Sequence, residues 1–262
     1  MSVKISRLHE TISREKLWKH KPVFCFTIDI DWASEAVLKI FFDELLKYEI
    51  RPTVFVTHHS DIINELFSDS QVERGIHPNF LAGSSHGSSY EDVIKTCLQF
   101  APEANLYRSH RGFCCTDTNH LMKDKFNFIA SSNTVTILQQ DLQPLFHESG
   151  LLEFPIFFED GTQLYNQMEL KLDPYLERFR SPGLKVISFH PMNFVINPPT
   201  LKYMRNIKDT LLREEYGNLS GNQLNSYRNY SPGIKDICSE ILDLSKQFDV
   251  LTLSELYNHS IS

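Results

Sequence analysis

The sequence has few cysteines and no Cys-X-X-Cys pair. Five thiols occur among 262 residues, at Cys25, Cys97, Cys114, Cys115 and Cys238. An odd number of cysteines, in a chain long enough to bury a large core without cross-links, favours reduced thiols in a reducing compartment. We therefore expect a cytoplasmic protein, and we expect any metal site to use ligands other than thiolates.

The sequence also lacks an excess of positive charge, a long apolar run and a nucleotide-binding glycine motif. It has 26 Lys and Arg against 33 Asp and Glu, and its basic residues are dispersed, which argues against a nucleic-acid or anionic-membrane partner. No apolar run approaches a membrane span, and residues 1–20, which we treat as an N-terminal extension, contain no apolar signal-peptide core. Without a Gly-X-Gly-X-X-Gly motif or a P-loop, a nucleotide-binding sheet is not indicated.

What the sequence does contain is an alternation of short apolar runs with helical patterns. Runs rich in aromatic and β-branched residues predict strands at 24–28, 53–57, 73–77, 105–108, 126–130, 151–158, 185–190 and 249–253. One helix should begin after Ser34 and another after Ser88, where Glu91 completes a capping box. This alternation predicts a parallel sheet in a single α/β domain over residues 21–262. The polar segment at about 197–233 is an insertion, either a lid or a surface loop.

Residues suited to catalysis or metal binding stand at the ends of the predicted strands. They are Asp29, Asp31, His58, His59, His77, Arg108, His110 and His190. Because β/α barrels assemble their active sites at the carboxyl ends of the strands, this distribution favours a closed barrel over a doubly wound sheet. If the chain stays extended through Ile30, Asp29 and Asp31 project to the same side. The alternative for this pair is one aspartate that caps a helix and one that forms a salt bridge.

Carboxylates and imidazoles together suit a divalent ion that activates water, and zinc is the ion we expect. His77, which lies in a turn between Gly75 and Pro78, is the strongest candidate ligand among the histidines. His86 could return to the same place across a loop of glycine and serine, but a structural role is equally compatible with the sequence. The adjacent pair His58 and His59 would splay apart, so we favour a structural or substrate role for it.

Two further residues have catalytic and structural interpretations. His190 follows the predicted strand 185–190, where it is either a general acid or a buried, hydrogen-bonded histidine. Arg108 could pair with an aspartate that acts as the base and keep that carboxylate ionised.

Taken together, these segments resemble the polysaccharide deacetylase superfamily, also called the NodB-homology or carbohydrate esterase family 4 group. The run Thr27-Ile28-Asp29-Ile30-Asp31 is similar to its first motif, Thr-Phe-Asp-Asp-Gly. The run Glu73-Arg74-Gly75-Ile76-His77 is similar to its second motif, Glu-Ile-Gly-Asn-His followed by a histidine four residues later. The segment 108–113 is similar to the third motif, an arginine on a strand before a glycine turn, and His190 is similar to the late-strand histidine. The segments 28–32, 75–80, 85–87 and 188–191 look closer to the WbmS-like branch, which is associated with lipopolysaccharide O-antigen biosynthesis.

The resemblance implies a distorted (β/α)7, TIM-like barrel that removes an acyl group from an amino sugar with the help of a divalent metal. It implies Asp29 as the base, Asp31 and His77 as metal ligands and His190 as the acid. Two departures matter: Ile30 separates the two aspartates, and Leu81 stands where the family has its second histidine. His86 or Asn79 would then have to substitute, and of these we expect His86 to be the third ligand.

The function expected from the sequence and the resemblance is therefore hydrolysis of an N-acyl group, with acetyl expected, on an amino sugar of surface polysaccharide or O-antigen biosynthesis. The expected partner is accordingly a carbohydrate or other small-molecule substrate. Arg108 would support catalysis, and Trp32, Asn79 and His110 would contact the substrate. The alternatives are an amidohydrolase that acts on another small amide and a barrel that has lost its metal and only binds a glycan. The sequence leaves the oligomeric state open.

Overall fold

The computed structural model describes residues 16–262, so most of the N-terminal extension expected at 1–20 lies outside the described residues. Within this part, ten strands form one sheet. The strands are β1 (Pro22–Asp29), β2 (Thr53–Val56), β3 (Glu73–Ile76), β4 (Leu106–Tyr107), β5 (Ala130–Ser131), β6 (Leu145–Phe146), β7 (Leu152–Glu153), β8 (Ile156–Glu159), β9 (Gly183–Phe189) and β10 (Asp249–Val250).

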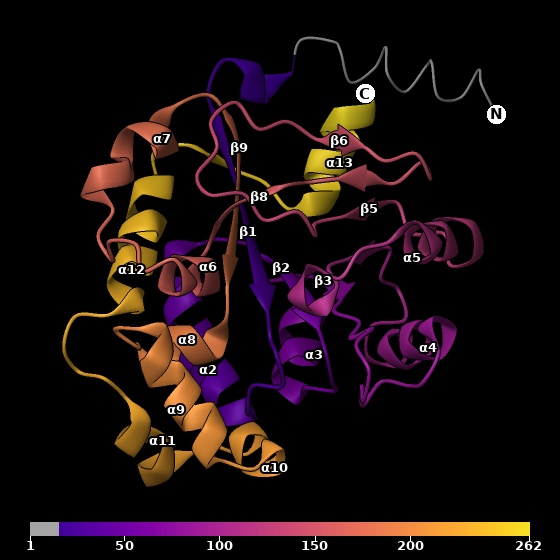
Figure 1. The fold of residues 1–262 in the computed structure, drawn as a ribbon. Helices are drawn as coiled ribbons and strands as arrows, with labels where there is room; N and C mark the ends of the chain where they lie inside the picture. Colours follow the sequence, from indigo (N-terminus) through magenta and orange to yellow (C-terminus); the bar gives the residue numbers. More distant parts are fainter. Residues whose placement is uncertain (1–15) are drawn as a thin grey trace.

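Helices connect most of these strands and pack around the sheet (Figure 1). The α-helices are α2 (Glu35–Leu45), α3 (Asp61–Ser68), α4 (Tyr90–Phe100), α5 (Thr116–His120), α6 (Asp160–Tyr165), α7 (Leu176–Arg180), α8 (Pro191–Ile196), α9 (Leu201–Thr210), α10 (Arg213–Gly217), α11 (Gly221–Tyr227), α12 (Ile234–Ser245) and α13 (Leu253–Ile261). Short 3-10 turns are η1 (Leu17–Lys19), η2 (Leu46–Tyr48), η3 (His110–Gly112) and η5 (Asp173–Tyr175), and η4 (Leu121–Lys125) is a π-helical turn. No helix in residues 16–262 is both long and apolar enough to cross a membrane.

The sheet curls until its two ends meet. Its strand order is β6-β7-β5-β4-β3-β2-β1-β9-β8, all neighbours are parallel except β6 and β7, and β10 also pairs with β1. The chain that follows β5 runs on beside β8, where Thr136 N donates to Ile156 O at 2.9 Å and Ile156 N donates to Thr134 O at 2.8 Å. Since β8 also pairs with β9, this contact joins the ends of the sheet. The distorted TIM-like barrel predicted from the sequence is confirmed.

Burial on both faces explains why the strands read as unbroken apolar runs. All eight residues of β1 are buried, and Phe24 stacks on Phe26, Phe179 and Phe248. A parallel strand covered on both faces needs apolar side chains at every position. The predicted 126–130 strand is reduced to Ala130 and Ser131, and the predicted 151–158 strand divides into β7 and β8 around Phe154 and Pro155.

The two expected helix starts have different outcomes. Ser34 caps α2 and accepts a hydrogen bond from Val37 N at 3.3 Å, as predicted. The prediction for Ser88 is wrong by one residue, because Ser89 is the N-cap of α4 and accepts from Asp92 N at 3.2 Å. The segment 197–233 folds into α9, α10 and α11, which lie below the carboxyl ends of the central strands in Figure 1.

Candidate active site

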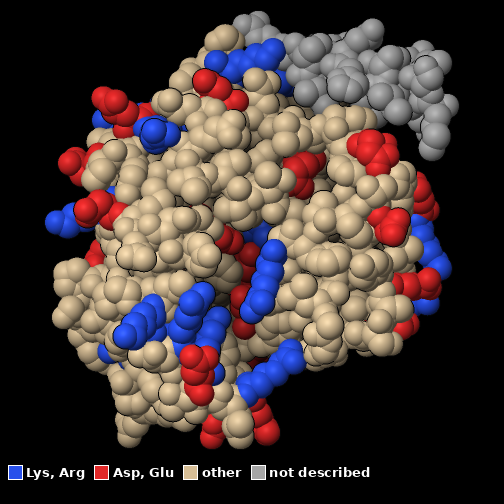
Figure 2. Space-filling model, in the orientation of Figure 1, with Lys and Arg blue, Asp and Glu red and all other residues tan. Residues whose placement is uncertain are grey.

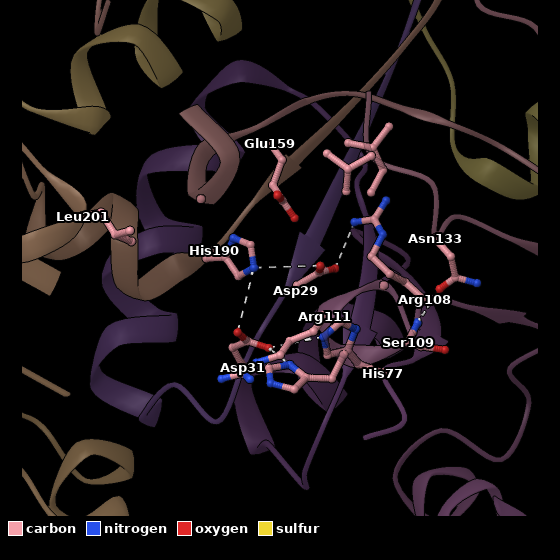
Figure 3. A pocket seen from close by; sticks show the side chains of 15 residues that line it. Asp29, Asp31, His77, Arg108, Ser109, Arg111, Asn133, Glu159, His190 and Leu201 are labelled. Carbon is pink, nitrogen blue, oxygen red and sulfur yellow. Dashed lines mark hydrogen bonds and ion pairs between the residues drawn. The ribbon is translucent and has the colours of Figure 1, made fainter. Parts of the chain in front are cut away.

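The carboxyl ends of the parallel strands carry the candidate catalytic residues to one edge of the barrel. Asp29 ends β1, Glu159 ends β8, and His190 directly follows β9. His77 and Arg108 directly follow β3 and β4. Figure 3 shows these side chains pointing toward one another, and Figure 2 shows acidic side chains inside a hollow at this edge.

Asp29 is buried and held by Arg108. Arg108 Nη1 lies 3.0 Å from Asp29 Oδ1, and both side chains are almost inaccessible to solvent. The same guanidinium donates to the Thr27 and Ser188 hydroxyls and to the Ser132 carbonyl and hydroxyl. A buried charge needs this degree of compensation, and a guanidinium with its donors engaged is fixed in place. Asp29 is therefore kept as an oriented carboxylate.

His190 lies between the two aspartates of the first motif. Its Nε2 is 4.0 Å from Asp29 Oδ2 and 3.8 Å from Asp31 Oδ2 (Figure 3). Its Nδ1 lies 2.5 Å from Oδ1 of Asp160, and its backbone N donates to Oδ2 of the same carboxylate at 2.8 Å. Burial alone would lower the pKa of His190, but Asp160, Asp31 and Asp29 outweigh burial and raise the pKa to about 10. His190 is therefore an imidazolium at neutral pH, with Nε2 directed into the site.

Asp31 meets two histidines, although not by the predicted route. The strand ends at Asp29, and Asp31 and Trp32 adopt left-handed φ angles of 41° and 56°, so a turn and not an extended strand places the Asp31 carboxylate. Asp31 Oδ1 lies 3.2 Å from His77 Nε2 and 3.1 Å from His110 Nδ1. Burial would raise the pKa of Asp31, but its hydrogen bonds with His110 and His77 and the charge of His190 hold it well below its usual range.

His86 lies outside this group, which differs from the ligand set expected from the sequence. Its Nε2 lies 2.7 Å from Thr57 O, and its Nδ1 accepts a hydrogen bond from Asn79 N at 3.2 Å and lies 3.3 Å from Cys97 Sγ. Both ring nitrogens are thus committed to holding the 78–87 loop. His110, which was expected to contact substrate, occupies the place beside Asp31 and His77.

Trp32 and Asn79 also pack in ways that differ from a substrate-contact role. The Trp32 ring lies against the rings of His86 and His110, at centroid distances of 5.5 and 5.1 Å, so it supports the second of these imidazoles. Asn79 Oδ1 accepts from Leu81 N at 3.1 Å in a local turn. Neither residue lines the cavity at this edge.

A cavity of about 360 Å³ opens over these groups. Its wall includes Glu159, Ser109 and Asn133. Burial raises the pKa of Glu159, whose carboxylate accepts a short hydrogen bond from the Thr162 hydroxyl. No role was predicted from the sequence for Glu159 or Asp160. Their position directly after an apolar run is the signal from which a place at this edge of the barrel could have been predicted.

Two clusters have the donor atoms that a divalent ion requires. In the first, ligand atoms of Asp31, His77 and His110 lie within 4.8 Å of one another, and in the second, so do those of Asp29, Glu159 and His190. One carboxylate with two imidazoles is a ligand set that catalytic zinc uses. Within residues 16–262, His77 Nδ1 is buried without a hydrogen-bond partner, so one nitrogen of this ring is uncommitted. The first cluster therefore fits a divalent ion, whereas in the second cluster His190 Nδ1 is engaged by Asp160 and Asp29 Oδ1 by Arg108.

Two solved structures are similar to this chain. The chain shares 24% identity with a WbmS protein of Bordetella bronchiseptica, assigned as a polysaccharide deacetylase involved in O-antigen biosynthesis. That likeness covers 85% of this chain and 90% of the other, with a TM-score of 0.73, and shows a common fold. A peptidoglycan N-acetylglucosamine deacetylase is 12% identical, over 92% of this chain and 94% of the other, with a TM-score of 0.45.

No curated protein matches the sequence significantly. The model of the WbmS-like polysaccharide deacetylases matches residues 26–208, which is more than half of the chain and includes every residue of the first cluster. The chain therefore belongs to the WbmS-like polysaccharide deacetylase family.

Proposed function

We propose that this protein is a metal-dependent hydrolase that removes an N-acetyl group from an amino sugar. The observation that carries the proposal is the meeting of three units at one cavity: the Arg108-bound carboxylate of Asp29, the protonated His190, and the ligand set of Asp31, His77 and His110. Hydrolysis of an amide needs a base, an acid and a means of stabilising negative charge on the carbonyl oxygen. Each unit supplies one of these.

The residues of the chain would divide the work as follows. A divalent ion, for which we propose zinc, would be held by Asp31, His77 and His110, where it would lower the pKa of water and polarise the acyl carbonyl. Asp29 would accept the proton of the attacking water. Arg108 contacts the Asp29 carboxyl group at 3.0 Å and holds it in place, so it would act as a positioning residue for the base.

Departure of the amine requires a proton, which His190 would donate from Nε2. The hydrogen bond between His190 Nδ1 and Asp160 fixes the ring so that Nε2 faces the cavity. The separation of Nε2 from Asp29 and Asp31, 4.0 and 3.8 Å, places the acid beside the base and the ligand set without a direct hydrogen bond to either. The same edge of the barrel would therefore supply both the proton acceptor, Asp29, and the proton donor, His190.

A sugar substrate is supported by unpaired polar atoms in the cavity wall. Ser109 Oγ and Asn133 Nδ2 are buried without a hydrogen-bond partner in the described chain, and both residues line the cavity. A buried polar atom left without a partner is costly, so a ligand that brings hydroxyl or amide groups would stabilise both. By analogy with the Bordetella protein, we further propose that the sugar is a precursor of a surface polysaccharide such as an O-antigen.

Acetate release from a panel of N-acetylated amino sugars tests this function. The Asp29→Asn variant removes the base but keeps its shape, and should lower kcat at least about 100-fold. Asp43→Asn is the matched control, since Asp43 is an exposed aspartate of α2 paired only with Lys39. Full activity in Asp29→Asn, or equal losses in both variants, would contradict the assigned role.

A further inference from the structure

A second cavity adjoins the catalytic one and has a different lining. It has a volume of about 450 Å³ and shares Asp31, Arg111 and His190 with the first cavity. Helix α9, from the insertion that follows β9, supplies part of its wall. Both volumes lie in the range of small-molecule sites. A substrate with its acyl group over Asp29 can therefore extend into the second cavity with another part of its structure.

Three lysine and arginine side chains line the second cavity, together with His190 and the carboxylates of Asp31 and Asp209. They are Arg111, Arg205 and Lys208. Within residues 16–262, their side chains form neither a hydrogen bond nor an ion pair; the Lys208 ammonium only faces the Tyr216 ring, 5.6 Å from its centroid. Figure 2 shows basic side chains gathered around the hollow over α9, with acidic ones inside. Folding thus leaves these positive charges available to a ligand.

The backbone at Arg111 adds a separate observation. Arg111 has a left-handed φ of 58°, which is uncommon for a residue with a Cβ atom and costs free energy. The turn places Arg111 in the walls of both cavities. In the catalytic cavity the charges are largely paired with one another, because Asp29 contacts Arg108 and Asp31 contacts His77 and His110. The cations at the junction would therefore attract a negative group of the substrate into the second cavity.

We propose that the substrate is a phosphorylated amino sugar and that Arg111, Arg205 and Lys208 bind its phosphate. This inference rests on the proposed deacetylase function and narrows its substrate class. Asp31 is engaged by His77 and His110, so the three positive charges face one further carboxylate, that of Asp209. The remaining excess of two matches a phosphate ester, which carries close to two negative charges at neutral pH. Arginine also presents a planar fork of donors that matches phosphate oxygens. The phosphate would anchor the substrate in the second cavity while the acylamino group reaches Asp29.

The first test compares acetate release from N-acetylglucosamine 1-phosphate and from N-acetylglucosamine. The wild-type protein should show a kcat/KM at least about tenfold higher for the phosphorylated sugar. The double variant Arg205→Gln/Lys208→Gln should reduce that preference at least about tenfold, mainly through KM. Lys202→Gln is the matched control, because Lys202 lies on the same helix, is exposed and does not line the cavity. Equal wild-type kcat/KM values for the two sugars, or an equal effect of Lys202→Gln, would overturn the proposal. So would a preference for N-acetylglucosaminuronic acid, whose negative group is a carboxylate.

The second test measures binding without turnover. Calorimetric titration with glucosamine 1-phosphate should give a Kd that rises at least about tenfold in the double variant and not in Lys202→Gln. If no sugar releases acetate but this titration behaves as expected, the phosphate site stands and the deacetylase function fails. If acetate is released from neutral sugars while glucosamine 1-phosphate binds no more tightly than glucosamine, the function stands and the phosphate site is overturned.

Discussion

Replacing Arg108 with methionine should destabilise the protein strongly, because it would leave Asp29 as a buried charge without its partner. Nitrogens of Arg108 lie within 3.0 Å of five oxygen atoms, and the side chain is almost completely buried. Removing one member of a buried ion pair typically costs about 3–5 kcal/mol. Since domains of this kind have free energies of unfolding of about 5–15 kcal/mol, the variant should still fold.

Urea unfolding of four proteins would measure this effect: the wild type, Arg108→Met, Asp29→Asn and the double variant. In the double variant the uncompensated charge is gone, so its loss should be about 1–3 kcal/mol smaller than the sum of the single losses. Lys39→Met is the control, because Lys39 pairs with Asp43 at 2.9 Å and both side chains are exposed, where such a pair contributes about 1 kcal/mol or less. A loss below 1 kcal/mol for Arg108→Met, or additive losses in the double variant, would refute the reasoning.

Three further predictions concern Asp160, Gly75 and Lys185. Asp160→Asn should lower kcat about 100-fold and leave metal content unchanged, because it removes the charge that supports the His190 imidazolium; an unchanged kcat would exclude that role. Gly75→Ala should lower the free energy of unfolding by about 1–3 kcal/mol, since a Cβ atom there would meet Leu106 O at 2.8 Å and the Phe55 ring at 2.7 Å; an unchanged urea midpoint would contradict this. Burial lowers the pKa of Lys185 from 10.5 to about 8. Below pH 8 the buried ammonium group therefore lowers the free energy of unfolding by up to about 3 kcal/mol. This loss decreases as pH rises toward 10.5, because the folded protein releases the proton at a lower pH than the unfolded chain does. Lys185→Met should therefore be more stable than wild type at pH 7 and gain little at pH 10, and thermal melts that show an equal gain at both pH values would argue against the buried charge.

Much of the framework could be predicted because the buried strands of the barrel produce a local pattern in the sequence. A strand buried on both faces needs a largely apolar sequence, and β1, β2 and β9 show such runs. The residue after each run then lies at the same edge of the sheet, which is why the pairing of Asp29 with Arg108 was foreseen. Strands of two residues, such as β4 and β5, are too short to fix their own boundaries.

The choice between His86 and His110 could not be made from local pattern. His110 lies 79 residues from Asp31 in sequence and meets it only because the sheet curls between β1 and β4, which are three strands apart. His86 is nearer to His77 along the chain, but its Nε2 is held 2.7 Å from Thr57 O. Hydrogen bonds of this kind depend on how a loop folds over neighbouring strands, and loop conformation carries no simple periodic signal.

The position of Asp31 illustrates a similar limit. Alternation along a strand predicts that residues two apart share a side, but here the strand stops first and the left-handed turn at Asp31 and Trp32 places the carboxylate. Aspartate adopts left-handed φ values more readily than most residues, but tryptophan does not, so the residue types indicate this turn only weakly. Asp29 and Asp31 thus reach one site, as expected, but through a turn that the alternation of the sequence does not indicate.

The metal content of untagged protein is the most direct test of the central claim that Asp31, His77 and His110 form a catalytic metal site. After incubation with zinc and removal of the excess, the wild type and His86→Gln should each retain about one ion per chain, and Asp31→Ala and His110→Ala should retain almost none. An ion lost in His86→Gln but kept in His110→Ala would contradict the ligand set. A wild-type protein that binds no zinc, cobalt, manganese or nickel would contradict the metal-dependent mechanism itself.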